Sequence, residues 1–355
     1  MKPSINWLLG LVPVTLALEH GGAPAPWVFF SAAIAIIPIA RLMVRSTEQL
    51  ATYTGEAVGG LLNATFGNAP ELIIAVVALR AGLLDMVRAS IVGAILANLL
   101  LALGVAFVVG GLRFHRQTYR ESAARVYSSM MLIAAISLTV PSAFSRFFAP
   151  EETLREEALL NVGLAVVLLG AYILYLVFML KTHPDEFAGE READSAHDGP
   201  RWSPGRALGG LLGASVLAAW MSEILVGAAE GTGTALGMSQ VFIGIVFLAI
   251  VGGAAESGSA IAMAGMNRMD LAVGIALGSC IQIALFIAPV LVLASYFVAP
   301  RPLELSFSRP EIGSLFMAAL IGALVAGDGR SNWYKGVQLV TVYLIVALMF
   351  YFIPG

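Results

Sequence analysis

Residues 67–79 read GNAPELIIAVVAL, so the carboxylate of Glu71 is followed by an unbroken apolar run. The glycine and proline before it are typical of a break between two helical segments. A charged side chain at the centre of a membrane helix costs roughly 2.5–3.5 kcal/mol, and such a residue is by default a candidate for function. This stretch predicts a broken membrane helix with a functional acid just after the break.

The composition of the whole chain supports a membrane location. Of its 355 residues, 59% are hydrophobic and 12% are charged, and the mean hydropathy is +0.86. Soluble domains carry about 25% charged residues, so the composition excludes an ordinary cytosolic protein and a disordered chain. The net charge of −3 gives no basic footprint for nucleic acid, and one cysteine with four histidines excludes an internal disulfide and a zinc-finger framework. The sequence therefore predicts an all-α polytopic membrane protein.

About eleven stretches are long and apolar enough to span a bilayer, which takes roughly 20 helical residues. We expect them at 5–19, 26–44, 49–80, 86–110, 119–141, 156–180, 207–230, 238–266, 270–298, 311–327 and 333–353. The third and eighth are long and contain Gly-rich interruptions. The first also has features of a signal peptide, with Lys2 before an apolar run and Ala23-Pro24-Ala25 as a cleavage site. A retained leading helix is the preferred interpretation, because ten further spans already provide an insertion signal.

The basic residues of the expected loops are distributed unevenly. With the amino terminus in the cytoplasm, that side holds 13 Lys and Arg residues and the opposite side holds 6. Positively charged loops stay in the cytoplasm, so we expect the amino terminus inside and, after eleven spans, the carboxyl terminus outside. The expected location is the inner membrane of a bacterial cell.

A polar segment from Lys181 to about Pro204 separates the two membrane halves. Its carboxylates are those of Asp185, Glu186, Glu190, Glu192, Asp194 and Asp198. Two interpretations stay open. The segment is either a solvated tether or an acidic cytoplasmic segment that gathers cations near an entrance.

The second half repeats the first motif at an offset of 185 residues. Residues 252–256 read GGAAE, so Glu256 matches Glu71. Seven identities over 35 aligned positions are weak in apolar sequence, but acids inside membrane spans are rare. Because the offset contains five helices, an odd number, the second copy crosses the membrane in the opposite sense. Such inverted repeats are typical of secondary transporters, in which the binding site lies at the repeat interface.

The two glutamates suggest a transport mechanism. No Lys or Arg lies close to Glu71 or Glu256 in the sequence, so each carboxylate must be protonated or compensated by a bound cation. Burial and mutual repulsion favour protonation of the empty pair, whereas a divalent cation stabilises both anions. Protons and the cation then compete for one site, as an antiporter requires. Calcium accepts about 6–8 oxygen ligands, whereas softer metals prefer Cys or His, so the residues favour a hard ion.

Other groups are candidates for completing this site. Backbone carbonyls freed at Gly67, Gly252 and Gly253, with the Asn68 amide and water, would supply further oxygen ligands. Asn98 and Gln282 lie on the helices that follow the two motifs, where they either line a pore or hydrogen-bond between helices. A simpler explanation of Glu71 is a capping box with Asn68. It explains one motif but not the matching glutamate in the other.

Residues 59–74, GGLLNATFGNAPELII, resemble the first signature repeat of the cation/proton exchangers (CAX), a branch of the calcium/cation antiporter superfamily. GIALGS at 274–279, QIALF at 282–286 and DGRSNW at 328–333 are also similar to that family. The resemblance covers nearly the whole chain. It implies a leading helix at 1–22, a first five-helix repeat at 23–180 with its motif at 67–71, an acidic cytoplasmic linker at 181–204, and a second, inverted repeat at 205–355 with its motif at 252–256.

The resemblance also implies an activity, namely calcium extrusion driven by protons. It makes Glu71 and Glu256 the shared cation and proton site. The supporting residues that we expect are Gly67, Asn68, Gly252, Gly253, Ser257, Asn98, Ser279 and Gln282. No cofactor is expected beyond the transported Ca²⁺ and H⁺.

Two departures from the family pattern affect this site. The second family motif usually carries Asn before and His after its Ala-Ala-Glu core, where this chain has Gly253 and Ser257. The first copy has Ala94 and Ala97 where small hydroxyl residues are usual. Cation selectivity and the number of protons exchanged therefore stay open.

Other functions fit the sequence less well. A sodium-driven calcium exchanger, or an exchanger of another cation for protons, is the main alternative. A channel is a weaker one, because paired broken helices in inverted halves suit alternating access. An enzyme is not expected, because the chain has neither a His-Glu-x-x-His nor a Gly-x-Ser-x-Gly motif. The expected partners are the cation, protons and the lipid bilayer, with no nucleic acid, and the oligomeric state, a homo-oligomer included, is left open.

Overall fold

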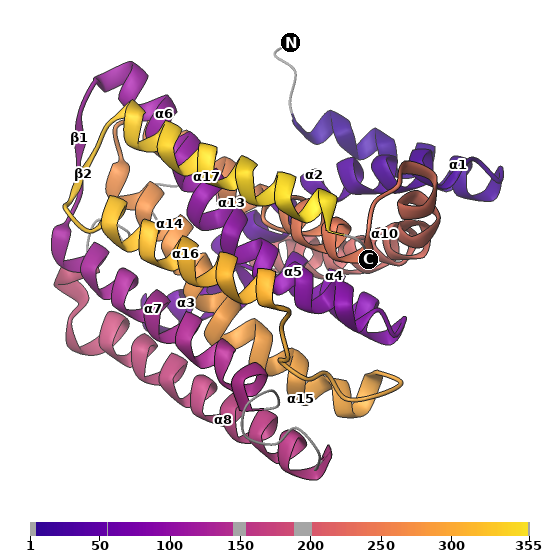
Figure 1. Cartoon of the computed structure of the whole chain (residues 1–355). Helices are drawn as coiled ribbons and strands as arrows, with labels where there is room; N and C mark the ends of the chain where they lie inside the picture. Colours follow the sequence, from indigo (N-terminus) through magenta and orange to yellow (C-terminus); the bar gives the residue numbers. More distant parts are fainter. Residues whose placement is uncertain (1–4, 55, 145–153, 188–200, 354–355) are drawn as a thin grey trace. The chain divides into compact units, whose positions relative to one another are not determined.

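The computed structural model describes residues 5–54, 56–144, 154–187 and 201–353, and these are almost entirely helical (Figure 1). The first half contains η1 (Ile5–Gly10), α1 (Leu11–His20), α2 (Ala25–Ala51), α3 (Glu56–Phe66), α4 (Ala69–Arg80), α5 (Leu84–Leu96), η2 (Ala97–Ala102), α6 (Leu103–Phe114), β1 (Gln117–Thr118), α7 (Glu121–Ala143), α8 (Leu154–Val177), η4 (Phe178–Thr182) and η5 (Pro184–Phe187). The second half contains α10 (Pro204–Leu236), α11 (Gln240–Phe242), η6 (Ile243–Leu248), α12 (Ala249–Gly252), α13 (Ala254–Gly265), α14 (Met269–Gln282), η7 (Ile283–Ile287), α15 (Ala288–Val298), α16 (Arg309–Ala326), β2 (Arg330–Ser331) and α17 (Trp333–Phe352). η1 and η5 are 3₁₀ helices, whereas η2, η4, η6 and η7 are π-helical.

The helices confirm the prediction of an all-α polytopic membrane protein. Among the described residues, eight helices are long and apolar enough to cross a membrane, and the broken pair Gln240–Gly252 with Ala254–Gly265 makes a ninth if it is one span. The two other expected stretches correspond to the shorter apolar helix Trp7–His20 and to the α3–α4 pair. The ends of the second stretch differ from the prediction. α2 begins at Ala25 and continues to Ala51, beyond the expected end at residue 44, so the helix is longer than the apolar run that predicted it.

The two long stretches are interrupted where their glycines predicted a break. α3 ends at Phe66 and α4 begins at Ala69, and α12 ends at Gly252 just before α13 begins at Ala254. Pro70 lies in the first turn of α4, where its missing N–H removes no helical hydrogen bond. Each motif glutamate therefore lies in the first turn of the second half-helix.

The contacts divide the chain into two compact units, and each unit contains parts of both sequence halves. Unit 1 holds the described residues of 1–93, 198–255 and 349–355, and unit 2 holds those of 94–197 and 256–348. The boundaries expected between the two repeats stay a prediction.

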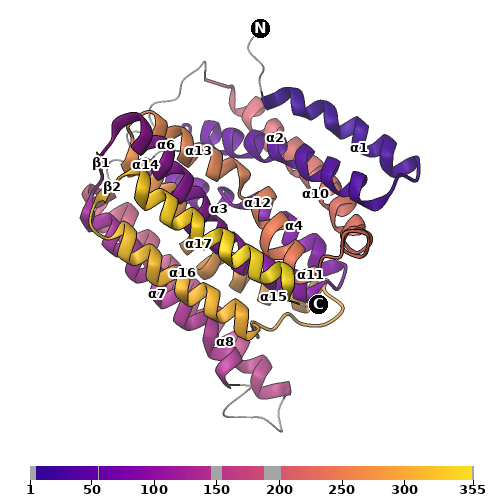
Figure 2. The same cartoon turned by 45° about the horizontal axis from the view of Figure 1, so that its top comes forward.

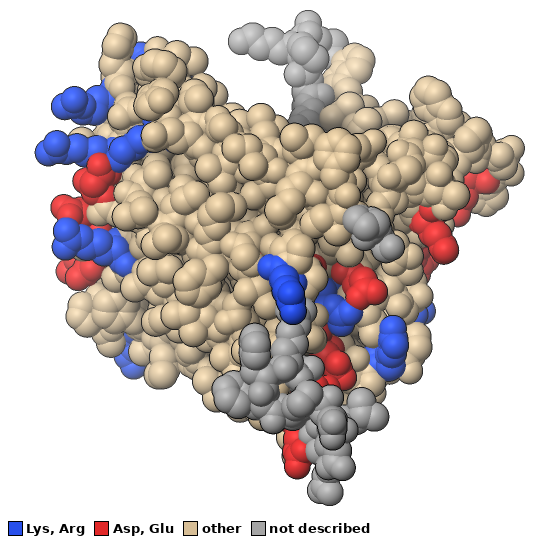
Figure 3. Space-filling view, in the orientation of Figure 1, with Lys and Arg blue, Asp and Glu red and all other residues tan. Residues whose placement is uncertain are grey.

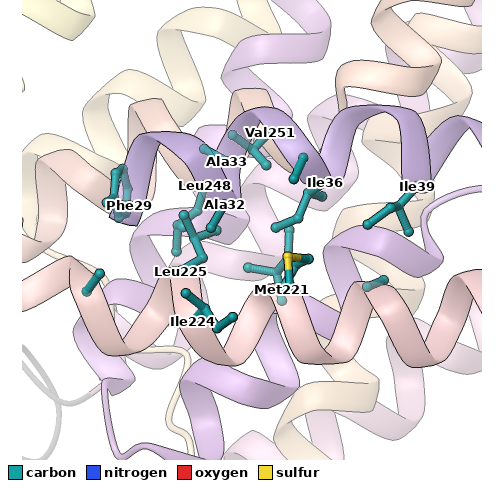
Figure 4. Close-up of a cluster of buried hydrophobic side chains, with 14 of the residues drawn as sticks. Phe29, Ala32, Ala33, Ile36, Ile39, Met221, Ile224, Leu225, Leu248 and Val251 are labelled. Atoms are coloured by element: carbon teal, nitrogen blue, oxygen red, sulfur yellow. The ribbon is translucent and has the colours of Figure 1, made fainter. Parts of the chain in front are cut away.

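In unit 1, α2 and α10 lie side by side, as both views show (Figures 1 and 2). Their contact is a cluster of buried apolar side chains (Figure 4). The cluster includes Phe29, Ala32, Ala33, Ile36 and Ile39 of α2, Met221, Ile224 and Leu225 of α10, Leu248 of η6 and Val251 of α12. The spacing of three and four residues puts these side chains on one face of each helix, and the alanines let the two backbones approach.

In unit 2, α7 packs against α14 and α16, and α8 packs against α15. α6 and α17 approach closely at two glycines. A Cβ atom added to Gly336 would clash with the carbonyl of Gly104 and the amide of Val108. Small residues at such crossings are typical of membrane helices, because they let van der Waals contacts form between backbones.

A polar cluster joins the loops at one end of unit 2. β1 pairs with β2 in antiparallel register, and Lys335 forms an ion pair with Asp328 at 2.6 Å. At the left edge of Figure 3, where β1 and β2 lie in Figure 1, acidic and basic side chains gather on the surface. The Tyr119 hydroxyl donates to the Ala326 carbonyl at 2.9 Å. Burial raises the pKa of Tyr119, and the charge of Asp328 raises it further, so the phenol stays a donor at ordinary pH.

The expected acidic linker lies mostly outside the described residues. Glu190, Glu192, Asp194 and Asp198 are not described. Its first part forms η5, where Phe187 is buried and its ring contacts Tyr127 with centroids 5.6 Å apart. Whether the linker gathers cations stays a prediction.

Candidate functional site

Glu71 lies in the first turn of α4 and is 8% exposed. The partial positive charge at a helix amino terminus favours an anion in this position. A Cβ atom added to Gly252 would lie 2.8 Å from the Cγ atom of Glu71 and 3.5 Å from its Cα atom. Gly252 therefore lies directly against Glu71 within unit 1, and a side chain at this position would displace the glutamate.

Asn68 precedes α4 and is 1% exposed. Its side chain makes no capping hydrogen bond, and neither its Oδ1 nor its Nδ2 atom has a hydrogen-bond partner in the part of the chain that the structure describes. Its backbone angles, φ −94° and ψ 29°, differ from the extended conformation that a capping residue usually adopts. The capping-box explanation of Asn68 is therefore wrong. Buried amides nearly always have a hydrogen-bond partner. We therefore expect the Asn68 amide to bind water or a ligand.

The glycines of the two motifs lie at the helix breaks. The N–H of Gly67 donates to the carbonyl of Asn63 at 2.8 Å, which closes the last turn of α3. The N–H of Gly253 donates to the carbonyl of Ala249 at 3.1 Å, which closes α12 in the same way. Whether the carbonyls at the breaks bind a cation stays a prediction.

Glu256 lies in the first turn of α13 and is 7% exposed. Its position relative to the start of its helix is that of Glu71, so the helix amino terminus again favours a carboxylate. Ser257, the residue after it, is half-buried. Both belong to unit 2, whereas Gly252 and Gly253 belong to unit 1.

Three further candidates lie in unit 2. Asn98 is on η2, and Ser279 and Gln282 are on α14, which packs against η2. All three are at least nine-tenths buried. Both amide atoms of Asn98 and the Nε2 atom of Gln282 have no hydrogen-bond partner among the described residues.

The π-helical turns beside these amides were not predicted. η2 begins at Ala97 and η7 at Ile283. Each lies one helix after a broken pair, η2 after α3–α4 and α5, and η7 after α12–α13 and α14. The two π-helical turns therefore occupy corresponding places in the two halves of the chain. π-helical turns in α-helices often occur at functional sites. The signal in the sequence was indirect, namely a polar residue in an apolar run, Asn98 in the first half and Gln282 in the second.

The structure thus brings Glu71 together with Gly252 in unit 1, and the helices of Asn98 and Gln282 together in unit 2. The described residues contain no group of three or more His, Cys, Asp or Glu side chains that could hold a metal. A cation bound by one or both glutamates would take its further ligands from amide, hydroxyl, backbone or water oxygens. Such ligands are typical of hard ions such as calcium.

Comparisons with known proteins agree with this architecture. The sequence pattern of the family described as sodium/calcium exchanger protein matches residues 24–181 and 206–352. The chain is 39% identical to the Ca(2+)/H(+) antiporter of Aphanothece halophytica, over 98% of this chain and 96% of that one. It is 40% identical to the Ca(2+)/H(+) antiporter ChaA of Bacillus subtilis (strain 168), over 92% and 93% of the two chains. The solved structure of native YfkE is similar, with a TM-score of 0.85, 36% identity and coverage of 99% and 100%.

Proposed function

We propose that this chain, which belongs to the sodium/calcium exchanger protein family, is a secondary antiporter that exchanges Ca²⁺ for H⁺ across a membrane. Two relatives that match more than nine-tenths of its length carry the name Ca(2+)/H(+) antiporter. Membership and the apolar helices make the chain an integral membrane protein. The family is one of transporters, so no enzyme activity is proposed.

Glu71 and Glu256 are proposed to form one shared site for the cation and the protons. The observation that carries this proposal is the contact of Glu71 with Gly252. Glu256 follows Gly252 by four residues, and consecutive Cα atoms are about 3.8 Å apart, so the chain itself keeps the second glutamate near this region. The inverted repeat of secondary transporters places a site in the same way, between the half-helices of the two copies.

Competition at this site would drive the exchange. Without a cation, burial and repulsion favour protonated carboxylates. A bound Ca²⁺ stabilises both anions and releases their protons. The amino termini of α4 and α13 favour the ionised forms, which opposes the effect of burial on the two carboxylates.

The remaining ligands are proposed to come from the buried amides. Calcium takes about 6–8 oxygen ligands in a flexible geometry, more than two carboxylates provide. The Oδ1 atoms of Asn68 and Asn98 have no hydrogen-bond partner among the described residues. In Gln282 the atom without such a partner is Nε2, which is a donor and not a cation ligand. Alternating access would expose this site to each side of the membrane in turn.

Ion flux in proteoliposomes tests this function. We expect external Ca²⁺ to release protons from acid-loaded vesicles, and a sodium gradient to produce no Ca²⁺ uptake. The sodium arm is needed because the family description includes sodium. Calcium uptake that follows a sodium gradient and leaves the internal pH unchanged would contradict the proposal.

A further inference from the structure

Trp202 connects the two long helices of unit 1, immediately before α10. It is 9% exposed, and two hydrogen bonds hold it against the last turn of α2 and the turn that follows this helix. Its backbone N–H donates to the Oε1 atom of Gln49 at 2.8 Å, and the Tyr53 hydroxyl donates to its carbonyl at 2.5 Å. The backbone that carries this indole ring is therefore fixed relative to the carboxyl-terminal end of α2.

Two guanidinium groups lie over this ring. The Cζ atom of Arg45 is 5.1 Å from the ring centroid, and that of Arg206 is 4.7 Å from it. Cations at such distances are attracted to the face of an indole. One ring thus holds two like charges near each other, although both arginine residues are otherwise exposed.

Two more arginines complete this group. Arg41 precedes Arg45 by one helical turn on α2, which puts both on one face, and Arg201 is the neighbour of Trp202 in the chain. All four are exposed. None of the four forms an ion pair with Asp or Glu in the ranges that the structure describes. We call Arg41, Arg45, Arg201 and Arg206 the arginine cluster.

The position of Arg206 adds to the excess of positive charge. It lies in the first turn of α10, where the Ser203 side chain accepts a hydrogen bond from its backbone N–H. A helix amino terminus repels cations and attracts anions. An anion bound here would interact favourably with the end of α10 and with several guanidinium groups at the same time.

We propose that the arginine cluster binds the phosphate of an anionic membrane lipid. The cluster lies where two membrane-spanning helices end, and Trp side chains are enriched at that level of a bilayer. The planar guanidinium group binds phosphate oxygens through two parallel hydrogen bonds. Basic residues beside membrane helices also attract anionic lipid headgroups. Lipid binding at the arginine cluster is independent of which cation the protein transports.

Thermal unfolding of the detergent-purified full chain tests the proposal. The protein is titrated with phosphatidylglycerol, with phosphatidylcholine of the same acyl chains, and with inorganic phosphate. We expect a saturable rise in Tm with phosphatidylglycerol alone. Arg45→Gln and Arg206→Gln should each raise the half-saturating lipid concentration by about fivefold, the effect of one basic residue near an anionic membrane.

Matched variants distinguish a lipid site at the arginine cluster from a general effect of the protein's positive charge on lipid binding. Arg301→Gln and Arg309→Gln remove the same charge from exposed arginines of unit 2 and should leave the titration unchanged. Arg206→Lys keeps the charge but loses the planar fork, so weaker binding by this folded variant would support the site even if Arg206→Gln unfolds. Equal shifts for the cluster and control variants would overturn the proposal, as would equal stabilisation by phosphatidylcholine or by inorganic phosphate.

Discussion

Gly252 makes room for Glu71. A Cβ atom on this glycine would lie 2.8 Å from the Cγ atom of the glutamate, well inside normal contact distance. The Glu71 side chain of the first half thus packs against Gly252, at the helix break of the second half. The two motifs are therefore similar in sequence and also in direct contact.

Gly252→Ala should impair exchange more than stability. Forcing a methyl group into this contact costs about 1–3 kcal/mol by overpacking, and the strain falls on Glu71. We expect the rate of Ca²⁺/H⁺ exchange to fall by about tenfold or more, measured in proteoliposomes with equal protein content.

Gly258→Ala is the matched control. Gly258 is exposed on α13, and nothing lies within 4 Å of the position that its Cβ atom would take, so activity should be unchanged. If Gly252→Ala exchanged as fast as Gly258→Ala, the contact with Glu71 would have no part in transport.

Asn68→Ala should weaken calcium binding. The buried Asn68 amide has no hydrogen-bond partner among the described residues, so its removal costs the protein little. If the amide is a ligand, the loss of about 1 kcal/mol would raise the half-saturating Ca²⁺ concentration by about fivefold at an unchanged maximal rate. Gln338→Ala removes an exposed amide from α17 and should have no effect. An unchanged affinity in Asn68→Ala would remove this residue from the site.

Ser257→His should shift the pH dependence of exchange. It places a ring with an ordinary pKa of about 6.5 beside Glu256, and a charged ring would repel calcium. Ser257→Ala removes only a hydroxyl group and should mainly weaken the apparent affinity, since one hydrogen bond is worth about 1 kcal/mol. Transport rates from about pH 5.5 to 8.5 separate the two effects. Two profiles that coincide with that of the parent would show that residue 257 faces away from the ion.

Acid should weaken the loop cluster of unit 2 through Asp328. Burial alone would raise the pKa of this carboxyl, but the hydrogen bond and charge of Lys335, with the N–H of Arg330, hold it below the ordinary value of 3.8. The lowered pKa adds stability above pH 3.8, and this stability is lost as the pH falls through the lower folded value.

Asp328→Asn should therefore lower Tm near neutral pH, and its difference from the parent should shrink as the medium is acidified below the ordinary pKa. Lys335→Gln removes the same ion pair and should give the same trend. A difference in Tm that stays constant with pH in both variants would exclude a role of this pair in stability. The group is half exposed, so the effect should be small.

Much of the fold could be predicted from the sequence because membrane helices need long apolar runs. The breaks were also predictable, since Gly67 is followed by Pro70 three residues later and Gly253 follows a second glycine. The alternative of a capping box with Asn68 was open in the sequence because spacing alone does not reveal backbone angles, and the structure excludes it. The repeat led us to expect the two motifs at one site, but not that Gly252 packs against the Cγ atom of Glu71. The stacking of Arg45 on Trp202 was not predictable, because the two residues are more than 150 positions apart in the sequence.

Proton release on Ca²⁺ binding tests the shared site most directly. It is measured by calorimetry of the purified protein in buffers with different ionisation enthalpies. We expect the parent to release roughly one to two protons per bound Ca²⁺, with an affinity that increases with pH. Glu71→Gln and Glu256→Gln should each lose calcium binding or most of this release while remaining folded. Calcium binding with undiminished proton release in either variant would contradict the two-glutamate site.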